Sequence, residues 1–155
     1  RLARVADNLA RLGCDASLQL GDAAAPAAWW DGRPFDRVLL DVPCSATGAI
    51  RRHPDIRLLR RADDVADLAR RQAAMLEAIW PLLVPGGKLL YVTCSLLPVE
   101  NDECVGAFAA RHGDARALPL PEGWGHARGL GRQLLPGETG NGDGFFYALL
   151  QKEST

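Results

Sequence analysis

The chain has 155 residues, of which 48% are hydrophobic and 24% are charged. This is the size and composition of one globular domain with a core, and it excludes disordered and collagen-like proteins. The formal net charge is −1, so no overall positive field attracts nucleic acid and any such binding depends on a local patch.

Four cysteines, Cys14, Cys44, Cys94 and Cys104, occur without a visible secretory leader and without an apolar run long enough to cross a bilayer. We therefore expect a reducing, cytoplasmic setting and no membrane contact. None of the cysteine spacings is that of a zinc site, so no metal is expected.

The first elements predicted are a helix and a short strand. Apolar residues recur at helical spacing from residue 1 to residue 12, and Gly13 ends the pattern. Because the helix is already under way at residue 1, we interpret the chain as a fragment whose beginning lies elsewhere. The alternating residues 16–20 predict a strand closed by Gly21 and Asp22, and residues 23–34 predict a loop with one helical turn around Trp29 and Trp30.

The middle of the chain predicts a strand, a long connection and a helix. Residues 37–40 are apolar without alternation, which is typical of a strand covered on both faces. Residues 45–62 are rich in arginine, and a connection of that length is usually functional or mobile. A helix capped by Asp63 or Asp64 then presents residues at helical spacing: Val65, Leu68, Gln72, Met75, Leu76, Ile79 and Leu83.

The last third of the chain continues this alternation. Pro85-Gly86-Gly87 precedes a strand over 88–92, and a second helix is predicted from Pro98 to Arg111. A short strand over 115–118, a loop over 119–142 and a strand over 145–150 follow. Alternating strands and helices predict an α/β fold with a mostly parallel sheet and helices on both faces.

Two cysteines follow two of the predicted strands. Ligands collect outside the carboxyl ends of the strands in such a sheet, so Cys44 and Cys94, fifty residues apart, are predicted to face one cleft. Cys94 is either an inert core residue or a nucleophile, and the flanking Thr93 and Ser95 favour the nucleophile, which must act as its thiolate. Cys44 follows Asp41 with a proline between them, which is either a site or a carboxylate capping a turn beside a packed cysteine.

Three further features have both a functional and an ordinary interpretation. Asp22 is a candidate to bind a cofactor hydroxyl or amine, although Gly-Asp is also common turn chemistry. The segment 142–146 is either a turn into an edge strand or a pair of aromatic rings that stack on a base. A basic cluster is either a solvated face or a local RNA patch with forked phosphate donors, and its members are Arg51, Arg52, His53, Arg57, Arg60 and Arg61.

Taken together, Asp41-Val42-Pro43-Cys44-Ser45 and Thr93-Cys94-Ser95 resemble motifs of the RNA (cytosine-5) methyltransferases. The stretches 45–48, 51–55, 98–101 and 142–146 are similar to those of the bacterial ribosomal enzymes of the RsmB (Sun, Fmu) type. The resemblance covers nearly the whole chain. It implies a class I, Rossmann-like methyltransferase sheet truncated at its N-terminal side, with S-adenosylmethionine as cofactor. It also implies ribosomal RNA, of the 16S kind, as partner, and a monomer.

The resemblance also implies roles for individual residues. Cys94 matches the nucleophile that adds to C6 of the target cytosine, and Cys44 matches the cysteine that assists release of the methylated base. Asp41 matches the residue that contacts the base near N3, and Asp22, Asp41 and Pro43 match the cofactor side of the site. A covalent adduct of this kind turns an unreactive aromatic carbon into a nucleophile.

By the same resemblance, residues 1–155 are the C-terminal portion of one catalytic domain. The glycine-rich cofactor loop, the acidic ribose ligand, the first two strands and an RNA-binding domain are expected before residue 1. We therefore expect residues 16–20 to lack a pairing neighbour and the 155 residues alone to bind the cofactor poorly and to be inactive. Two alternatives stay open: methylation of a transfer RNA cytosine, and RNA binding without chemistry.

Overall fold

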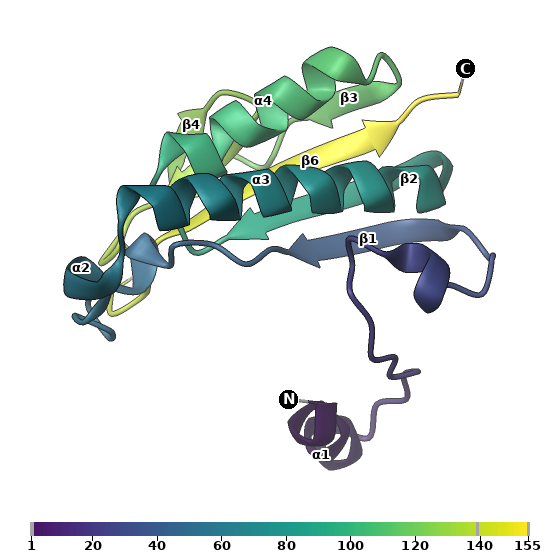
Figure 1. Cartoon of the computed structure of the whole chain (residues 1–155), viewed down its shortest axis with the longest axis horizontal. Helices are drawn as coiled ribbons and strands as arrows, with labels where there is room; N and C mark the ends of the chain where they lie inside the picture. The colour runs from purple at the N-terminus through teal and green to yellow at the C-terminus, as the bar shows by residue number, and fades with distance from the viewer. Residues whose placement is uncertain (1, 139, 155) are drawn as a thin grey trace.

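A computed structural model describes residues 2–138 and 140–154 of the chain (Figure 1). Arg1, at the start of the first predicted helix, lies outside the described residues. The elements in chain order are α1 (Leu2–Leu12), β1 (Phe35–Asp41), α2 (Ile56–Leu59), α3 (Ala62–Ile79), β2 (Leu83–Thr93), α4 (Asp102–Arg111), β3 (Ala115–Leu118), β4 (His126–Arg128), β5 (Gly131–Leu134) and β6 (Phe145–Lys152). Single turns of 3₁₀ helix occur at Pro26–Ala28, Thr47–Ala49, Trp80–Leu82 and Pro98–Glu100.

One sheet runs through the molecule in the order β1-β2-β6-β5-β4, and β3 also pairs with β6. Strands β1 and β2 are parallel, with Asp41 opposite Val92 at their carboxyl ends. All other pairings are antiparallel. The prediction of a mostly parallel sheet is therefore wrong for the described residues, because the short connections after β3 turn the chain back on itself. Strand β6 is an inner strand, so the expectation of an edge strand there is also wrong.

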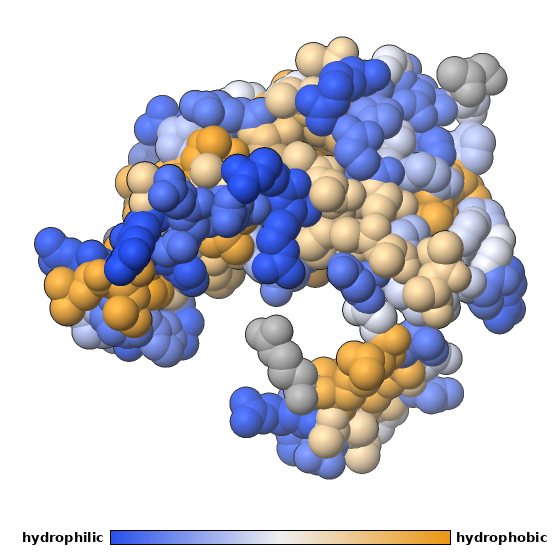
Figure 2. All heavy atoms as spheres, in the orientation of Figure 1, coloured by the Kyte–Doolittle hydropathy of each residue, from blue (hydrophilic) through white to orange (hydrophobic). Residues whose placement is uncertain are grey.

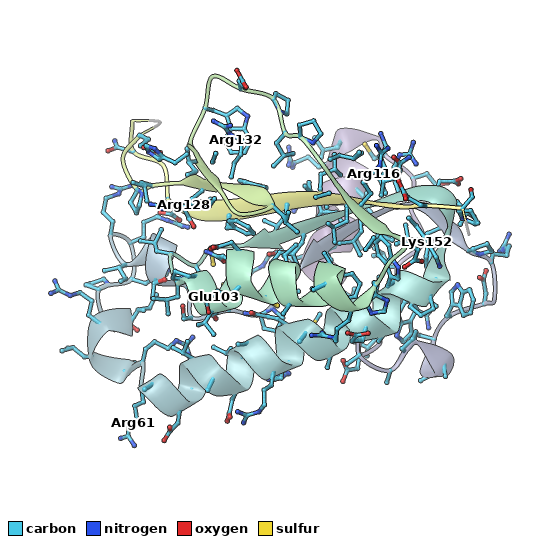
Figure 3. All side chains as sticks on the ribbon, turned by 90° about the horizontal axis from the view of Figure 1, so that it is seen from above. Arg61, Glu103, Arg116, Arg128, Arg132 and Lys152 are labelled. Carbon is cyan, nitrogen blue, oxygen red and sulfur yellow. The ribbon has the colours of Figure 1, made fainter. Side chains whose placement is uncertain are left out.

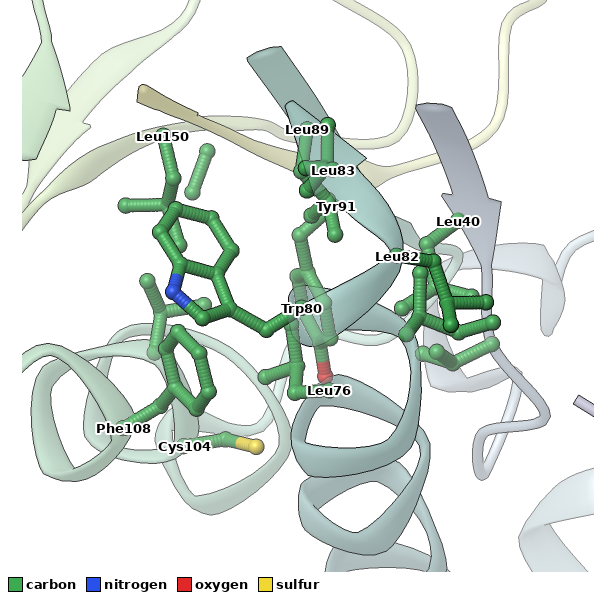
Figure 4. Packing of buried hydrophobic residues seen from close by; sticks show 14 of the residues in the cluster. Leu40, Leu76, Trp80, Leu82, Leu83, Leu89, Tyr91, Cys104, Phe108 and Leu150 are labelled. Carbon is green, nitrogen blue, oxygen red and sulfur yellow. The ribbon is translucent and has the colours of Figure 1, made fainter. Parts of the chain in front are cut away.

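Helices α3 and α4 cover one face of the sheet, and the core lies beneath them (Figures 1 and 4). Leu76, Tyr91, Phe108 and Phe146 are fully buried there, and the rings of Trp80 and Phe108 meet edge to face at 5.4 Å. Each such side chain contributes about 1.5–3 kcal/mol of hydrophobic stabilisation.

The opposite face of the sheet carries no helix among the described residues. Leu90 of β2 and Tyr147 of β6 instead line a shallow apolar pocket with Leu120, Trp124 and Leu134. The ring of Trp124 meets Tyr147 edge to face at 5.5 Å. The irregular segment that precedes β4 therefore covers this face of the sheet. The prediction of helices on both faces is wrong for the described residues.

The N-terminal segment lies apart from the sheet. Helix α1 forms as predicted, but it has no buried residue, and Figure 2 shows it as a separate body whose apolar side chains are accessible. Residues 16–20 form no strand, and Leu20 is 80% exposed. Within residues 2–138 and 140–154, β1 pairs only with β2, so no neighbouring strand there satisfies the backbone of residues 16–20. Leu40 of β1 is buried but Leu39 is 67% exposed, so β1 is covered on one face and not on both as predicted.

The remaining elements agree in outline with the sequence pattern. The backbone N–H of Arg61 donates to the carboxylate of Asp64 at 3.0 Å, so Asp64 caps α3 from its third position, whereas Arg61 is the N-cap residue. The predicted turn at residues 85–87 lies inside β2 as an irregularity, because the pairing skips from Leu83 to Lys88. The predicted loop over 119–142 contains the β4–β5 hairpin, whose strands are too short for a period-two pattern to reveal.

None of the helices within residues 2–138 and 140–154 is both long enough and apolar enough to span a membrane.

Candidate active site

The two cysteines selected from the sequence meet at one edge of the sheet. Cys44 follows β1 and Cys94 follows β2, and the carboxyl ends of parallel neighbours lie side by side. The two sulfur atoms are 3.4 Å apart, within hydrogen-bond distance for thiols. The prediction that the thiols share a cleft is confirmed.

A cavity of about 550 Å³ opens at this edge. It holds five of the predicted site residues, namely Asp22, Asp41, Pro43, Cys44 and Cys94. Its volume lies in the range of small-molecule sites. Arg71 and Met75 of α3 also line it. The helical spacing of apolar residues predicted Met75 on the inner face of the helix, but no pattern singled out Arg71.

The contact between the thiols gives them different acidities. A hydrogen bond from Cys44 lowers the pKa of Cys94 to about 7, against burial and the negative charges of Asp41 and Asp143. The same hydrogen bond, together with burial, raises the pKa of Cys44 above its usual range. Near neutral pH the pair therefore offers a reactive thiolate at Cys94 and a protonated thiol at Cys44.

A buried polar network lies behind the thiols. Ser45, Ser95, Glu100 and Asn101 are at most 1% exposed. The Asn101 amide donates to the Ser95 carbonyl at 2.9 Å and its oxygen accepts from Thr93 Oγ1 at 2.6 Å. No sequence pattern predicted this network. The residues following the two cysteines are thus fixed by side-chain hydrogen bonds as well as by the sheet.

Gly48 is the point at which three segments of the site meet. Its N–H donates to the Cys94 carbonyl and its own carbonyl accepts from the Gly144 N–H, both at 2.9 Å. A Cβ atom at Gly48 would lie 2.2 Å from the Gly144 oxygen. Nearby, Ala46 has a φ of 59°, a left-handed conformation that is unusual for a residue with a side chain. Local backbone strain of this kind gathers at functional sites.

Two arginines of the predicted RNA patch are tied to the site. The guanidinium of Arg52 forms an ion pair with Asp143, whose side chain is 5% exposed. The Nε of Arg60 donates to the Ser45 carbonyl at 3.0 Å. These side chains hold the 45–62 connection against the sheet edge.

The rest of the predicted patch faces outward. Arg51 donates to the carbonyl of Asn141, and it is exposed together with His53, Arg57 and Arg61. Figure 3 shows Arg61 projecting away from the sheet at the start of α3. RNA contact by these residues stays a prediction.

Two other predicted features are placed by the structure. Phe146 is fully buried, 6.4 Å from the ring of Tyr91, so it cannot stack on a base, and that part of the expectation is wrong. Phe145 is partly exposed and stacks on Tyr147 at 6.0 Å. Asp22 is exposed, and its carboxylate accepts from the backbone N–H of Ala24 at 2.9 Å, which is turn chemistry at the mouth of the cavity.

Within the part of the chain that the structure describes, no group of three or more His, Cys, Asp or Glu side chains is placed to hold a metal ion.

Comparison with known proteins places this site in a family. A family model described as 16S rRNA methyltransferase RsmB/F matches residues 1–151. The chain belongs to the RsmB/F family. Its fold is accordingly that of an S-adenosylmethionine-dependent methyltransferase domain, which confirms the predicted fold class. The resemblance drawn from the two cysteine motifs is confirmed as well.

Individual members of the RsmB/F family are similar over almost the whole chain. A protein of Xanthomonas campestris named ribosomal RNA small subunit methyltransferase B is 56% identical over 156 residues, which is 99% of this chain and 36% of the relative. A protein of the same name from Pseudomonas putida is 56% identical over 152 residues, 98% of this chain and 35% of the relative. The chain thus spans about a third of the length of the curated relatives that it matches.

Among solved structures, NSun6 from Pyrococcus horikoshii with SFG superposes with a TM-score of 0.85 at 28% identity. The match covers 100% of this chain and 39% of the NSun6 chain.

Proposed function

We propose that this chain supplies the catalytic cysteines of an enzyme that methylates C5 of a cytosine in 16S ribosomal RNA through a covalent adduct. The observation that carries the proposal is the Cys44–Cys94 pair at 3.4 Å, in one cavity with Asp41. The family and the names of its curated members support ribosomal RNA as the substrate. NSun6 with SFG, an S-adenosylmethionine analogue, supports the cofactor.

In this proposal Cys94 is the nucleophile. Its thiolate forms a bond to C6 of the cytosine. The electron pair of the C5–C6 double bond shifts to C5, which thereby becomes nucleophilic. The carboxyl group of Asp41 lies in the same cavity and can contact the N3 edge of the base. The lowered pKa of Cys94 makes the attacking thiolate available near neutral pH.

Cys44 acts after methylation. Before the product departs, the C5 proton passes to solvent water as the base. The electron pair of the C5–H bond re-forms the C5–C6 double bond, and the bond from C6 to Cys94 breaks with its electron pair on sulfur. Cys44 stays protonated through its raised pKa and lies next to the departing sulfur. It is therefore placed to donate a hydrogen bond to that sulfur as the bond breaks.

The cavity fits the cofactor by size and by its polar lining. Asp22, Asp41 and Pro43 would hold S-adenosylmethionine, whose electrophilic methyl group is the donor to C5. We further propose that residues 1–155 are the C-terminal portion of the catalytic domain, and that residues preceding them in the enzyme hold the methionine and ribose ends of the cofactor. Weak cofactor binding and inactivity of the 155 residues alone follow. Micromolar affinity of this chain in calorimetry would contradict that part.

The target base must leave its stack to reach a thiol inside a cavity. The outward-facing His53, Arg57 and Arg61 would contact the RNA backbone beside it. We propose that the enzyme acts as a monomer in the cytoplasm, where free thiols persist.

Adduct trapping tests the proposal. The chain, extended at its N-terminus to the length of its relatives, is incubated with S-adenosylmethionine and 16S RNA that contains 5-fluorocytosine, which blocks loss of the C5 substituent. We expect an adduct that resists denaturation in the wild type and is absent from Cys94→Ser. Transfer RNA with the same label is the control substrate. Absence of an adduct with 16S RNA, despite measured RNA and cofactor binding, would refute the covalent mechanism.

A further inference from the structure

Glu100 is a fully buried acidic side chain at the centre of the site. It lies in the 3₁₀ turn Pro98–Glu100 and is 0% exposed. A buried carboxylate is costly unless hydrogen bonds satisfy it. The burial of the Glu100 carboxylate therefore requires hydrogen-bond donors around it.

Four donors converge on the two carboxylate oxygens. Oε1 accepts from the backbone N–H of Ser45 at 2.8 Å and from the Gln72 amide at 3.1 Å. Oε2 accepts from the hydroxyl groups of Ser45 and Ser95, each at 2.5 Å. Charge-assisted hydrogen bonds of this kind are about twice as strong as neutral ones.

These donors belong to the two segments that carry the thiols. Ser45 directly follows Cys44 and Ser95 directly follows Cys94. The Gln72 amide also donates to the Pro43 carbonyl at 2.9 Å. One carboxylate therefore contacts both cysteine segments, which lie fifty residues apart in the sequence, and α3, which crosses over them.

Glu100 is itself held from behind. The Tyr91 hydroxyl donates to the Glu100 carbonyl at 2.7 Å, and Tyr91 is a fully buried residue of β2. The neighbouring Asn101 amide donates to the Ser95 carbonyl at 2.9 Å and to the Gln133 side chain at 2.9 Å. The backbone from which the Glu100 side chain extends is thus held in place by the core.

We propose that Glu100 is a positioning residue, which fixes the separation of the Cys44 and Cys94 sulfurs by tying together the two segments that carry them. The effect on methylation rests on the proposed function, but the effect on the thiols does not. The rival explanation is that Glu100 only stabilises the fold. The two explanations differ in what they predict for the reactivity of Cys94 in the folded protein.

The test compares Glu100→Gln with Glu103→Gln in the full-length protein. Gln keeps the shape of Glu100 but replaces the charged acceptor Oε2 with an amide, so the Ser45 and Ser95 hydroxyls must reverse and accept, and weaker neutral hydrogen bonds replace the charge-assisted ones. Glu103 lies one turn further along, is exposed, and serves as the matched control (Figure 3). The rate of iodoacetamide alkylation at Cys94 is followed from pH 5 to pH 10 by peptide mass spectrometry, with the exposed Cys14 as internal reference.

We expect the alkylation midpoint of Cys94 to move in Glu100→Gln from about 7 towards that of an ordinary thiol. An ordinary thiol has a pKa of about 8.5, so the rate at pH 7 falls roughly tenfold. Glu103→Gln and Cys14 keep wild-type rates. A wild-type profile at Cys94 in folded Glu100→Gln would overturn the proposal and leave Glu100 as a stabilising residue only.

Ser45→Ala and Ser95→Ala provide a second route if Glu100→Gln fails to fold. Each removes one hydroxyl donor and leaves the carboxylate with three of its four donors. We expect each to slow alkylation of Cys94 at pH 7, by about twofold to threefold, in the same direction as Glu100→Gln. Wild-type profiles in both variants would overturn the proposal.

The failures of this inference and of the proposed function are distinguishable. Alkylation needs neither RNA nor cofactor, so a changed profile supports the role of Glu100 even if no RNA adduct forms. Where the adduct does form, Glu100→Gln should lower kcat and leave the KM for S-adenosylmethionine near its wild-type value.

Discussion

The guanidinium of Arg52 donates to both carboxylate oxygens of Asp143, with Nε at 3.0 and 2.8 Å from them. This ion pair joins the 45–62 connection to the segment before β6. The arginine side chain is 58% exposed, whereas the aspartate is almost completely buried. The negative charge of Asp143 raises the pKa of the nearby Cys94, so Arg52 offsets a charge that would otherwise suppress the thiolate.

Arg52→Ala should therefore lower the reactivity of Cys94. Loss of the positive charge leaves Asp143 unpaired beside the thiol, and the pKa of Cys94 rises. We expect the alkylation midpoint to rise by about half a pH unit, so alkylation of Cys94 at pH 7 should slow about twofold. Arg57→Ala, an exposed change in the same basic segment, is the control. An unchanged or faster rate in Arg52→Ala would show that Asp143 does not act on the thiol.

Arg57→Ala should affect RNA binding instead. Arg57 is exposed on α2, and a phosphate contact there would contribute affinity without regard to sequence. We expect weaker RNA binding and a decrease of about one in the slope of log K against log salt, with unchanged stability. Filter binding at several salt concentrations measures this. A wild-type slope would remove Arg57 from the RNA interface.

Gly48→Ala should destabilise the fold. The new Cβ would lie 2.2 Å from the Gly144 oxygen and 2.9 Å from the Cys94 oxygen, and both are backbone atoms that cannot swing away. We expect a loss of about 2 kcal/mol in the free energy of unfolding. Gly106→Ala in α4 is the control, because no atom lies within 4 Å of the Cβ that it would add. The higher helix propensity of alanine should raise the free energy of unfolding by about 0.5–1 kcal/mol. Urea denaturation of both variants measures the difference, and equal midpoints would contradict it.

Cys44→Ala should raise the pKa of Cys94 above that of an ordinary thiol. The hydrogen bond that lowers this pKa is removed, while burial and the charge of Asp41 still raise it. Alkylation of Cys94 at pH 7 should fall more than tenfold and recover only above about pH 8.5. Cys104→Ala, a change at a buried cysteine of α4, is the control. A midpoint that stays near 7 would assign the acidity of Cys94 to another cause.

Glu77→Gln should reduce stability in a pH-dependent way. Glu77 of α3 accepts from Arg111 at 2.9 Å and from His112 at 2.7 Å, and these contacts lower its pKa below 4.5. A carboxyl group whose pKa is lower in the folded chain than in the unfolded chain stabilises the fold at a pH above its unfolded pKa. This stabilisation is lost as the pH falls through the pKa of the folded chain. The side chain is 41% exposed, so after solvent screening we expect roughly 0.5 kcal/mol at pH 7. The difference from wild type should shrink as the pH falls below the ordinary carboxyl pKa, and a constant difference would contradict the linkage.

The sequence pattern was sufficient for the elements with strong periodicity and for the meeting of the thiols. Helix α3 and strand β2 are long, and placing Cys44 and Cys94 required only that two consecutive strands be parallel neighbours. The pattern failed at residues 16–20, whose alternation is that of a strand, because a strand also needs a partner for its backbone. It failed again at β4 and β5, because strands of three and four residues are shorter than any period that could be measured.

The polar network was harder to predict, because its members are distant in sequence. The role of Glu100 depends on the contacts by which Ser45 and Ser95 donate to the same carboxylate, and the sequence does not reveal these contacts. One signal was present in the sequence. Gln72 interrupts the apolar face of α3, and a polar residue on a buried face needs a partner in the core. No sequence pattern separated Arg52 and Arg60, which are bonded to Asp143 and to the Ser45 carbonyl, from the other arginines of the basic segment.

The parallel pairing of β1 with β2 has a consequence for folding. About forty residues, including all of α3, separate the end of β1 from the start of β2, and this loop must close before the strands can pair. Parallel, non-local contacts form slowly compared with helices and hairpins. The two sulfur atoms therefore come together only when this loop has closed. The rate at which a mild oxidant forms a disulfide between Cys44 and Cys94 during refolding would report when this loop closes. In the unfolded chain the two thiols are separated by fifty residues of flexible polypeptide, so their effective concentration is low and the disulfide forms slowly.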